Sequence, residues 1–151
     1  MLLNELDALP TLWEVQGTVA APVAAVAELL LAVTTGRVGD DNLLVLARAS
    51  AARQGAMTVV GAGHTFRAEL AGLVEPVEIQ VEGSRLAVQS WYGGVHAVTA
   101  CSTGTRVVHR VQRVLPEHPG FAPGIAELGM RTRMARDLQQ VLAVIADRLG
   151  C

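Results

Sequence analysis

The sequence predicts an α+β protein in which a curved antiparallel sheet of about seven strands is wrapped around one long C-terminal helix. The hydrophobic pattern has a period of two from residue 56 to about residue 115, which is the spacing of strands. From residue 125 to residue 149 the apolar residues instead recur at helical spacing. A long amphipathic helix has to bury its apolar stripe, and an antiparallel sheet offers a matching apolar face. The chain has 151 residues, and we expect residues 1–151 to form a single domain.

The first part of the chain predicts one strand followed by two short helices. Residues 12–19 alternate apolar and polar side chains, as a strand does. A helical apolar stripe follows at 20–33, where Pro22 suits the first turn and Gly36 ends the helix. Residues 40–55 carry capping residues at both ends and predict the second short helix.

Closely spaced strands with short turns fill the middle of the chain. Gly93 and Gly94 are expected to form a hairpin turn between two of them. A loop rich in proline and glycine at 116–124 then leads into the C-terminal helix at 125–149. The expected strands, which form an antiparallel meander of about six, span residues 56–61, 63–72, 75–83, 85–92, 95–102 and 104–114.

The charge and hydropathy patterns exclude several classes of partner. The net charge is −2, and this gives no electrostatic footprint for nucleic acid. The longest apolar stretch, 19–33, contains Pro22 and Glu28 and is shorter than the about 20 residues of a membrane-spanning helix. We therefore expect no integral membrane segment. The first ten residues lack the positive charge of a signal peptide, so a cytoplasmic location is expected.

The cysteine and lysine content adds two expectations. Cys101 and Cys151 lack the spacing of a metal site and are too few for a disulfide framework. No cofactor is expected. All 12 basic residues are arginine, and this alanine-rich, lysine-free composition is typical of a high-GC bacterial genome.

Four stretches of the sequence resemble the START-like superfamily (SRPBCC), which has the helix-grip fold. They are "VQGTVAAPVAAVAELL" at 15–30, "GAGHTFRAEL" at 61–70, "SRLAVQSWYGG" at 84–94 and "GTRVVHRV" at 104–111. The superfamily includes polyketide cyclase/dehydrase and lipid-transport proteins. The resemblance implies a deep, mostly apolar cavity between the sheet and the long helix, which holds lipids, sterols, polyketides or other hydrophobic molecules. It implies no catalytic motif, because the family shares none.

Side-chain parity predicts which residues face such a cavity. Successive residues of a strand point to opposite faces, so a strand with charges on one face turns the other face inward. The residues that parity or helical spacing directs toward the cavity, and that we expect to contact a ligand, are His64, Phe66, Val77, Ile79, Val88, Ser90, Val98, Val107, Val111, Met130, Met134 and Leu138.

Three further inward residues are candidate catalytic groups. His109 lies in the middle of a strand whose inward face is otherwise valine, and His96 and Tyr92 share the inward direction. A histidine exchanges protons near neutral pH, and a tyrosine can donate a hydrogen bond to a developing oxyanion. An inward histidine is also a common structural core residue, so both interpretations stay open. No carboxylate has inward parity near them, so no metal site is expected, and Arg113 reaches the rim of the same face.

Three functions fit these features. The first is a binder or carrier of a hydrophobic small molecule, supported by the apolar inward residues. The second is a polyketide cyclase/dehydrase-type enzyme that uses the histidines and the tyrosine as acid–base groups. The third is a protein-interaction module, for which Trp91 on the outer face is the one indication. The sequence does not indicate the ligand's identity, the size of the cavity or the oligomeric state.

Overall fold

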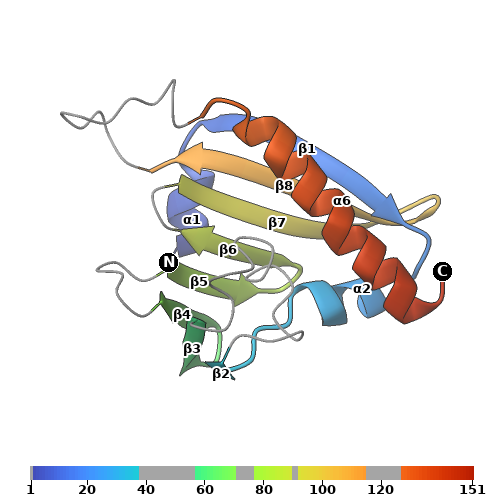
Figure 1. Cartoon of the computed structure of the whole chain (residues 1–151), viewed down its shortest axis with the longest axis horizontal. Coiled ribbons are helices and arrows are strands. Elements are labelled where there is room, and N and C mark those ends of the chain that lie inside the picture. The colour runs from blue at the N-terminus through green and yellow to red at the C-terminus, as the bar shows by residue number, and fades with distance from the viewer. Residues whose placement is uncertain (1, 38–56, 71–76, 90–91, 115–126) are drawn as a thin grey trace.

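The computed structural model describes residues 2–37, 57–70, 77–89, 92–114 and 127–151. Its central feature is one antiparallel sheet of eight strands in the order β1-β8-β7-β6-β5-β4-β3-β2 (Figure 1). The elements along the chain are α1 (Leu2–Asp7), β1 (Thr11–Val19), α2 (Val23–Leu30), β2 (Gly36–Arg37), β3 (Met57–Ala62), β4 (Thr65–Leu70), β5 (Val77–Glu82), β6 (Arg85–Gln89), β7 (Tyr92–Cys101), β8 (Gly104–Arg113) and α6 (Met130–Leu149).

The predicted α+β class and the long C-terminal helix are confirmed. The sheet has one strand more than the expected seven, because the two residues of β2 pair with β3. Gly36 therefore lies in a strand, and α2 ends earlier, at Leu30. The second short helix that we expected at 40–55 lies outside the described residues.

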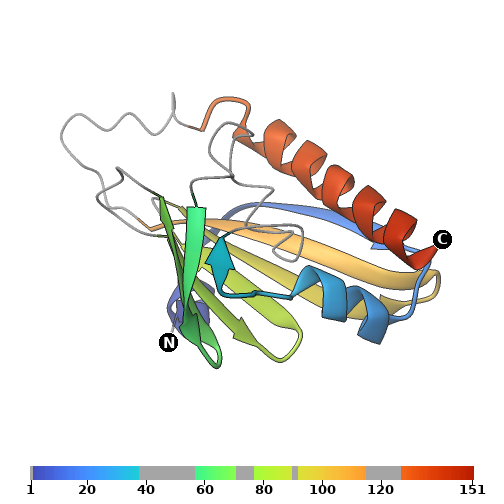
Figure 2. The ribbon, with the colours of Figure 1, turned by 60° about the horizontal axis from the view of Figure 1, so that its bottom comes forward.

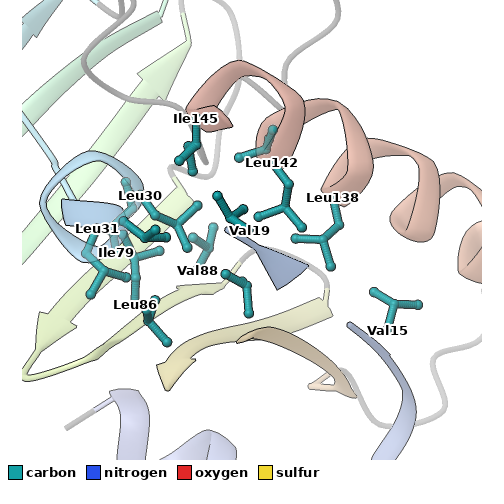
Figure 3. Close-up of a cluster of buried hydrophobic side chains, with 14 of the residues drawn as sticks. Val15, Val19, Leu30, Leu31, Ile79, Leu86, Val88, Leu138, Leu142 and Ile145 are labelled. Atoms are coloured by element: carbon teal, nitrogen blue, oxygen red, sulfur yellow. The ribbon is translucent and has the colours of Figure 1, made fainter. Parts of the chain in front are cut away.

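The sheet is curved, and its concave face is covered by α6 and α2 (Figure 2). Helix α6 crosses the sheet mainly over β1 (Figure 1). Helix α2 lies over one end of the long strands β7 and β8. Side chains from both helices and from seven strands meet in one apolar core between the layers, and Figure 3 shows several of them. The fully buried members at its centre include Val26, Leu30, Val59, Ile79, Leu86, Val88, Val107 and Ile145.

The opposite, convex face carries a second and smaller apolar core under α1, a helix that the sequence analysis did not predict. Leu3 and Leu6 of α1 are buried against Ala87 and Val95. The backbone N–H of Leu3 also donates a hydrogen bond to Oε1 of the buried Gln80, at 2.8 Å. This contact satisfies one of the free N–H groups at the start of the helix.

The predicted turn at Gly93 and Gly94 is wrong. Both glycines lie inside β7, where Gly93 pairs with Gln89 of β6. The physical reason is packing on the convex face: a β-carbon at Gly93 would overlap the side chain of Leu6. The glycine leaves room for Leu6 to pack directly on the sheet, so the pair is not a turn signal.

The start of β8 is tied to the connection between β1 and α2. The hydroxyl of Thr105 donates a buried hydrogen bond of 2.7 Å to the carbonyl oxygen of Ala21. Ala21 directly precedes Pro22, the residue that caps α2. The "GTR" and "AAP" stretches of the sequence are thus brought together, and their contact fixes α2 at one end of the sheet. Within the described residues, no helix is both long and apolar enough to cross a membrane.

Candidate functional site

The apolar residues expected to face the cavity lie on the concave face of the sheet or on α6. Their predicted placement is observed, and their contact with a ligand stays a prediction. Those that are buried are Ile79, Val88, Val98, Val107, Val111 and Leu138. Those that are half-buried are Phe66, Val77, Met130 and Met134. Ser90 lies outside the described residues, as does Trp91, on which the interaction-module hypothesis depends.

The predicted inward orientation of His64 is wrong. His64 lies in the turn between β3 and β4, and its side chain is exposed. Its backbone carbonyl accepts a hydrogen bond from the N–H of Val81, at 2.8 Å. Strand parity does not extend into a turn, and for this reason the alternation that correctly places Phe66 fails at His64.

His96 and His109 form a stacked pair on the concave face. They are directly opposite each other in the register of β7 and β8, and their ring centroids are 3.8 Å apart with planes inclined by 15°. Both are buried, with exposed fractions of 4% and 3%. Directly opposed side chains on one face of an antiparallel pair stand close together, which is why two flat rings stack here. Val15 and Leu86 occupy the flanking positions in the sheet.

A second polar group forms where β7 begins and β8 ends. Tyr92 lies opposite Arg113 in the register, although it belongs to β7 and not to the strand predicted at 85–92. The Arg113 guanidinium donates to Glu127: Nε to Oε1 at 3.1 Å, and Nη2 to Oε1 at 2.6 Å and to Oε2 at 3.0 Å. Glu127 lies in the turn before α6, and its side chain is 17% exposed against 39% for Arg113.

The pKa shifts in this group keep the tyrosine protonated. Burial raises the pKa of Tyr92 above its ordinary value of 10.0, and the charge of Glu127 raises it further, while Arg113 opposes both. The hydrogen bonds to Glu127 in turn raise the pKa of Arg113. At neutral pH the group therefore consists of a neutral phenol and a guanidinium–carboxylate ion pair.

Trp13 adds a neutral donor on the same face. It lies opposite Val111 in the register of β1 and β8. Its indole Nε1 is buried and has no hydrogen-bond partner among the residues that the structure describes. A buried N–H without an acceptor costs free energy, so the indole is available to donate a hydrogen bond to a bound molecule.

Together these residues run from one end of β7 and β8 to the middle of the two strands, on an otherwise apolar face. Tyr92 and His96 are four residues apart on β7, a span of about 13 Å at the rise of a strand. Among the described residues, no three histidine, cysteine or acidic side chains are grouped as metal ligands.

Two of these residues were not among the candidates from the sequence. Trp13 has the same parity as Val15, so the alternation of β1 could have identified it as an inward-facing residue. Glu127 lies in no strand, and parity could not place it. The available signal was Arg113, because an arginine on an inward face needs a carboxylate partner.

The position of Glu127 leads to a pH prediction. Replacing Glu127 by Gln removes a negative charge and a hydrogen bond, both of which raise the pKa of Tyr92, so this pKa should fall. Tyr92 is the protein's only tyrosine, so its ionisation can be followed alone by absorbance near 295 nm in an alkaline titration. In the wild type the folded phenol ionises later than the unfolded one. The free energy of unfolding should therefore decrease as the pH rises above about 10.

The matched control is Glu14→Gln. Glu14 forms an ion pair of 2.8 Å with Arg110 on the convex face, and both side chains are exposed. This variant makes the same change of charge away from Tyr92 and should leave the midpoint of the tyrosine titration in place. A midpoint that does not move in Glu127→Gln would contradict the described contact.

Comparisons with known proteins give a likeness of fold only. No protein-family model matches the chain, and no curated protein matches it. Among 18 matching chains of solved structures is the protein BH1534 of Bacillus halodurans, with 15% identity and a TM-score of 0.48, covering 91% of this chain and 97% of that one. Another is the protein CV1439 of Chromobacterium violaceum, with 14% identity and a TM-score of 0.43, covering 91% of this chain and 99% of that one. These similarities are too low to assign a family or a function.

Proposed function

We propose that this chain is a START-like protein of a single domain that binds a hydrophobic small molecule between the concave face of the sheet and α6. The ligand would be of lipid, polyketide or aromatic type. The observation that carries the proposal is the buried His96–His109 pair, set with the indole N–H of Trp13 on a face that is otherwise apolar. Ligand sites in proteins have this composition, with an apolar lining and a few polar groups that orient the molecule.

A purely structural role explains the Trp13 indole less well. A buried N–H costs free energy when it has no acceptor, and the indole has none among the described residues. The neighbouring inward positions on β8, Val107 and Val111, are apolar and almost completely buried. An indole N–H without a partner in such surroundings is accounted for when a ligand supplies the hydrogen bond.

The test is a titration with N-phenyl-1-naphthylamine, an apolar probe, followed through the imidazole carbon–hydrogen signals in NMR spectra. We expect saturable shifts of the His96 and His109 signals, which are assigned with the single variants His96→Phe and His109→Phe. His64 serves as an internal control, because its ring is exposed in a turn. Binding on the concave face leaves its signal in place.

Two outcomes would overturn the proposal. One is the absence of any saturable shift at His96 and His109. The other is a shift of His64 as large as theirs, which would indicate nonspecific association. Native mass spectrometry of the purified protein complements the titration, since an adduct that is lost on denaturation would identify the ligand class directly.

A second candidate function, a cyclase/dehydrase-type activity, is favoured by one observation. Tyr92 and His109 lie on the same face of adjoining strands, where a phenol and an imidazole could serve as the acid–base groups of such an enzyme. The two functions differ in what Tyr92→Phe and His109→Phe would do. An enzyme would lose turnover of a poly-β-ketone substrate while it still binds the molecule, whereas a carrier would keep most of its affinity and have no turnover to lose.

A further inference from the structure

We propose that the ligand is uncharged and carries a hydrogen-bond acceptor such as a carbonyl oxygen, and that Glu127 determines this preference by occupying the guanidinium of Arg113. This inference rests on the proposed function and specifies the chemical class of its ligand. It makes Glu127 a specificity-determining residue. Free carboxylic acids, including fatty acids in their ionised form, would be rejected.

The first step of the argument concerns charge on the concave face. Among the described strand residues, Arg113 is the one charged side chain that shares the inward parity of His109 and Val111. Other charged strand residues lie on the convex face, where they form exposed ion pairs such as Arg110 with Glu14. A ligand carboxylate on the concave side would therefore depend on Arg113 for its counter-charge.

The second step is that Arg113 is already paired. Its Nε and Nη2 atoms donate three hydrogen bonds of 2.6 to 3.1 Å to the two carboxylate oxygens of Glu127. A second carboxylate would have to displace Glu127 or lie beside it. Displacement breaks a charge-assisted pair, and close approach places two negative charges together, so both are unfavourable.

The third step is that the available donor is neutral. The buried indole N–H of Trp13 lacks an acceptor among the described residues, while the phenol of Tyr92 already hydrogen-bonds with Glu127 and Arg113. A neutral donor matches a neutral acceptor without adding a charge that must be compensated. On the described part of α6, the half-buried ionisable residue is Asp137, which adds negative and not positive charge. A carbonyl or a similar uncharged acceptor is the group that fits these surroundings.

The experiment compares two compounds with the same ring system, 2-acetonaphthone and 2-naphthoate, at pH 7, where the second is a carboxylate. Dissociation constants are measured from the His96 and His109 imidazole signals. We expect wild type to bind the ketone more tightly by about tenfold or more, the range in which like charges discriminate between partners. Glu127→Gln leaves Arg113 without its partner and should reduce this ratio by about tenfold or reverse it.

Two further variants separate the role of Glu127 from a general effect of charge. Glu14→Gln removes the same charge from the exposed pair on the convex face and should keep the wild-type ratio. Arg113→Gln removes the cation and should keep ketone binding without gaining binding of the carboxylate. It also provides a second test if Glu127→Gln is not stable enough to measure.

The outcomes distinguish this inference from the proposed function. Equal or tighter binding of 2-naphthoate by wild type overturns the inference and leaves hydrophobic ligand binding in place. An unchanged ratio in Glu127→Gln also overturns it, because Glu127 would then not determine the preference. Failure of wild type to bind 2-acetonaphthone overturns it as well. Failure of N-phenyl-1-naphthylamine to bind overturns the proposed function itself.

Discussion

Replacement of Gly104 by Ala should lower the free energy of unfolding by about 3–4 kcal/mol, an unusually large effect for the addition of one methyl group. Gly104 has a φ of +133°, a conformation that residues with a side chain rarely adopt. Its missing β-carbon would lie 2.5 Å from the carbonyl oxygen of Val19 and 2.8 Å from the nitrogen of Ala21. Both atoms belong to the backbone, so they cannot move aside as the end of a flexible side chain would.

Gly36→Ala is the matched control for this prediction. Gly36 has a φ of +107°, and no atom of the described residues lies within 4 Å of the position of its missing β-carbon. This variant carries the backbone strain without the steric overlap and should lose about 1–2 kcal/mol. Urea denaturation followed by tryptophan fluorescence measures both. Equal losses would show that the close approach of β8 to the connection between β1 and α2 is not what Gly104 is needed for.

The strands were predictable because a period of two leaves few alternatives. Val107, His109 and Val111 lie on the concave face, as the alternation required, since a shift of one residue would have exposed all three. The two residues of β2 and the six of α1 are too short to show a period. Their existence depends on contacts with distant parts of the chain, which a local pattern does not contain.

Local signals failed where tertiary packing determined the residue type. Gly93 resembles a turn residue, yet it is a glycine because Leu6, almost ninety positions earlier in the chain, packs on it. Gln80 looks like the solvent-facing member of an alternating strand, yet it is buried and receives the N–H of Leu3. The environments of Gly93 and Gln80 both depend on α1, so one unpredicted helix explains why local signals failed at both positions.

The candidate site was predictable in its strand residues and not in its partners. Parity placed His96 and His109 on one face, and their stacking follows from the exact pairing of β7 with β8, in which the two residues are directly opposite each other. Glu127 could not be placed, because its position depends on the path of the chain before α6. The inward Arg113 indicated that a carboxylate partner was needed, but it did not indicate which residue supplies it.

The packing of α6 on the sheet gives the second large expected effect. Ile145 is fully buried in the main core, and Figure 3 shows its side chain pointing from the helix toward the cluster that contains Leu30. Ile145→Ala should lower the free energy of unfolding by about 2–5 kcal/mol, because it removes buried surface and leaves a cavity. Val144→Ala is the control: Val144 is the preceding residue of the same helix and is 40% exposed.

Both substitutions replace a β-branched residue by alanine, so both gain helix propensity by a similar amount, a few tenths of a kcal/mol. The difference between them therefore measures mainly burial against the sheet, with a contribution from the one extra carbon of isoleucine. Val144→Ala should stay within about 0.5 kcal/mol of wild type, as surface substitutions do. Urea denaturation of both variants makes the comparison. Similar losses in the two would mean that α6 does not bury the stripe containing Ile145, and the concave face would then lack the cover that a ligand site between sheet and helix requires.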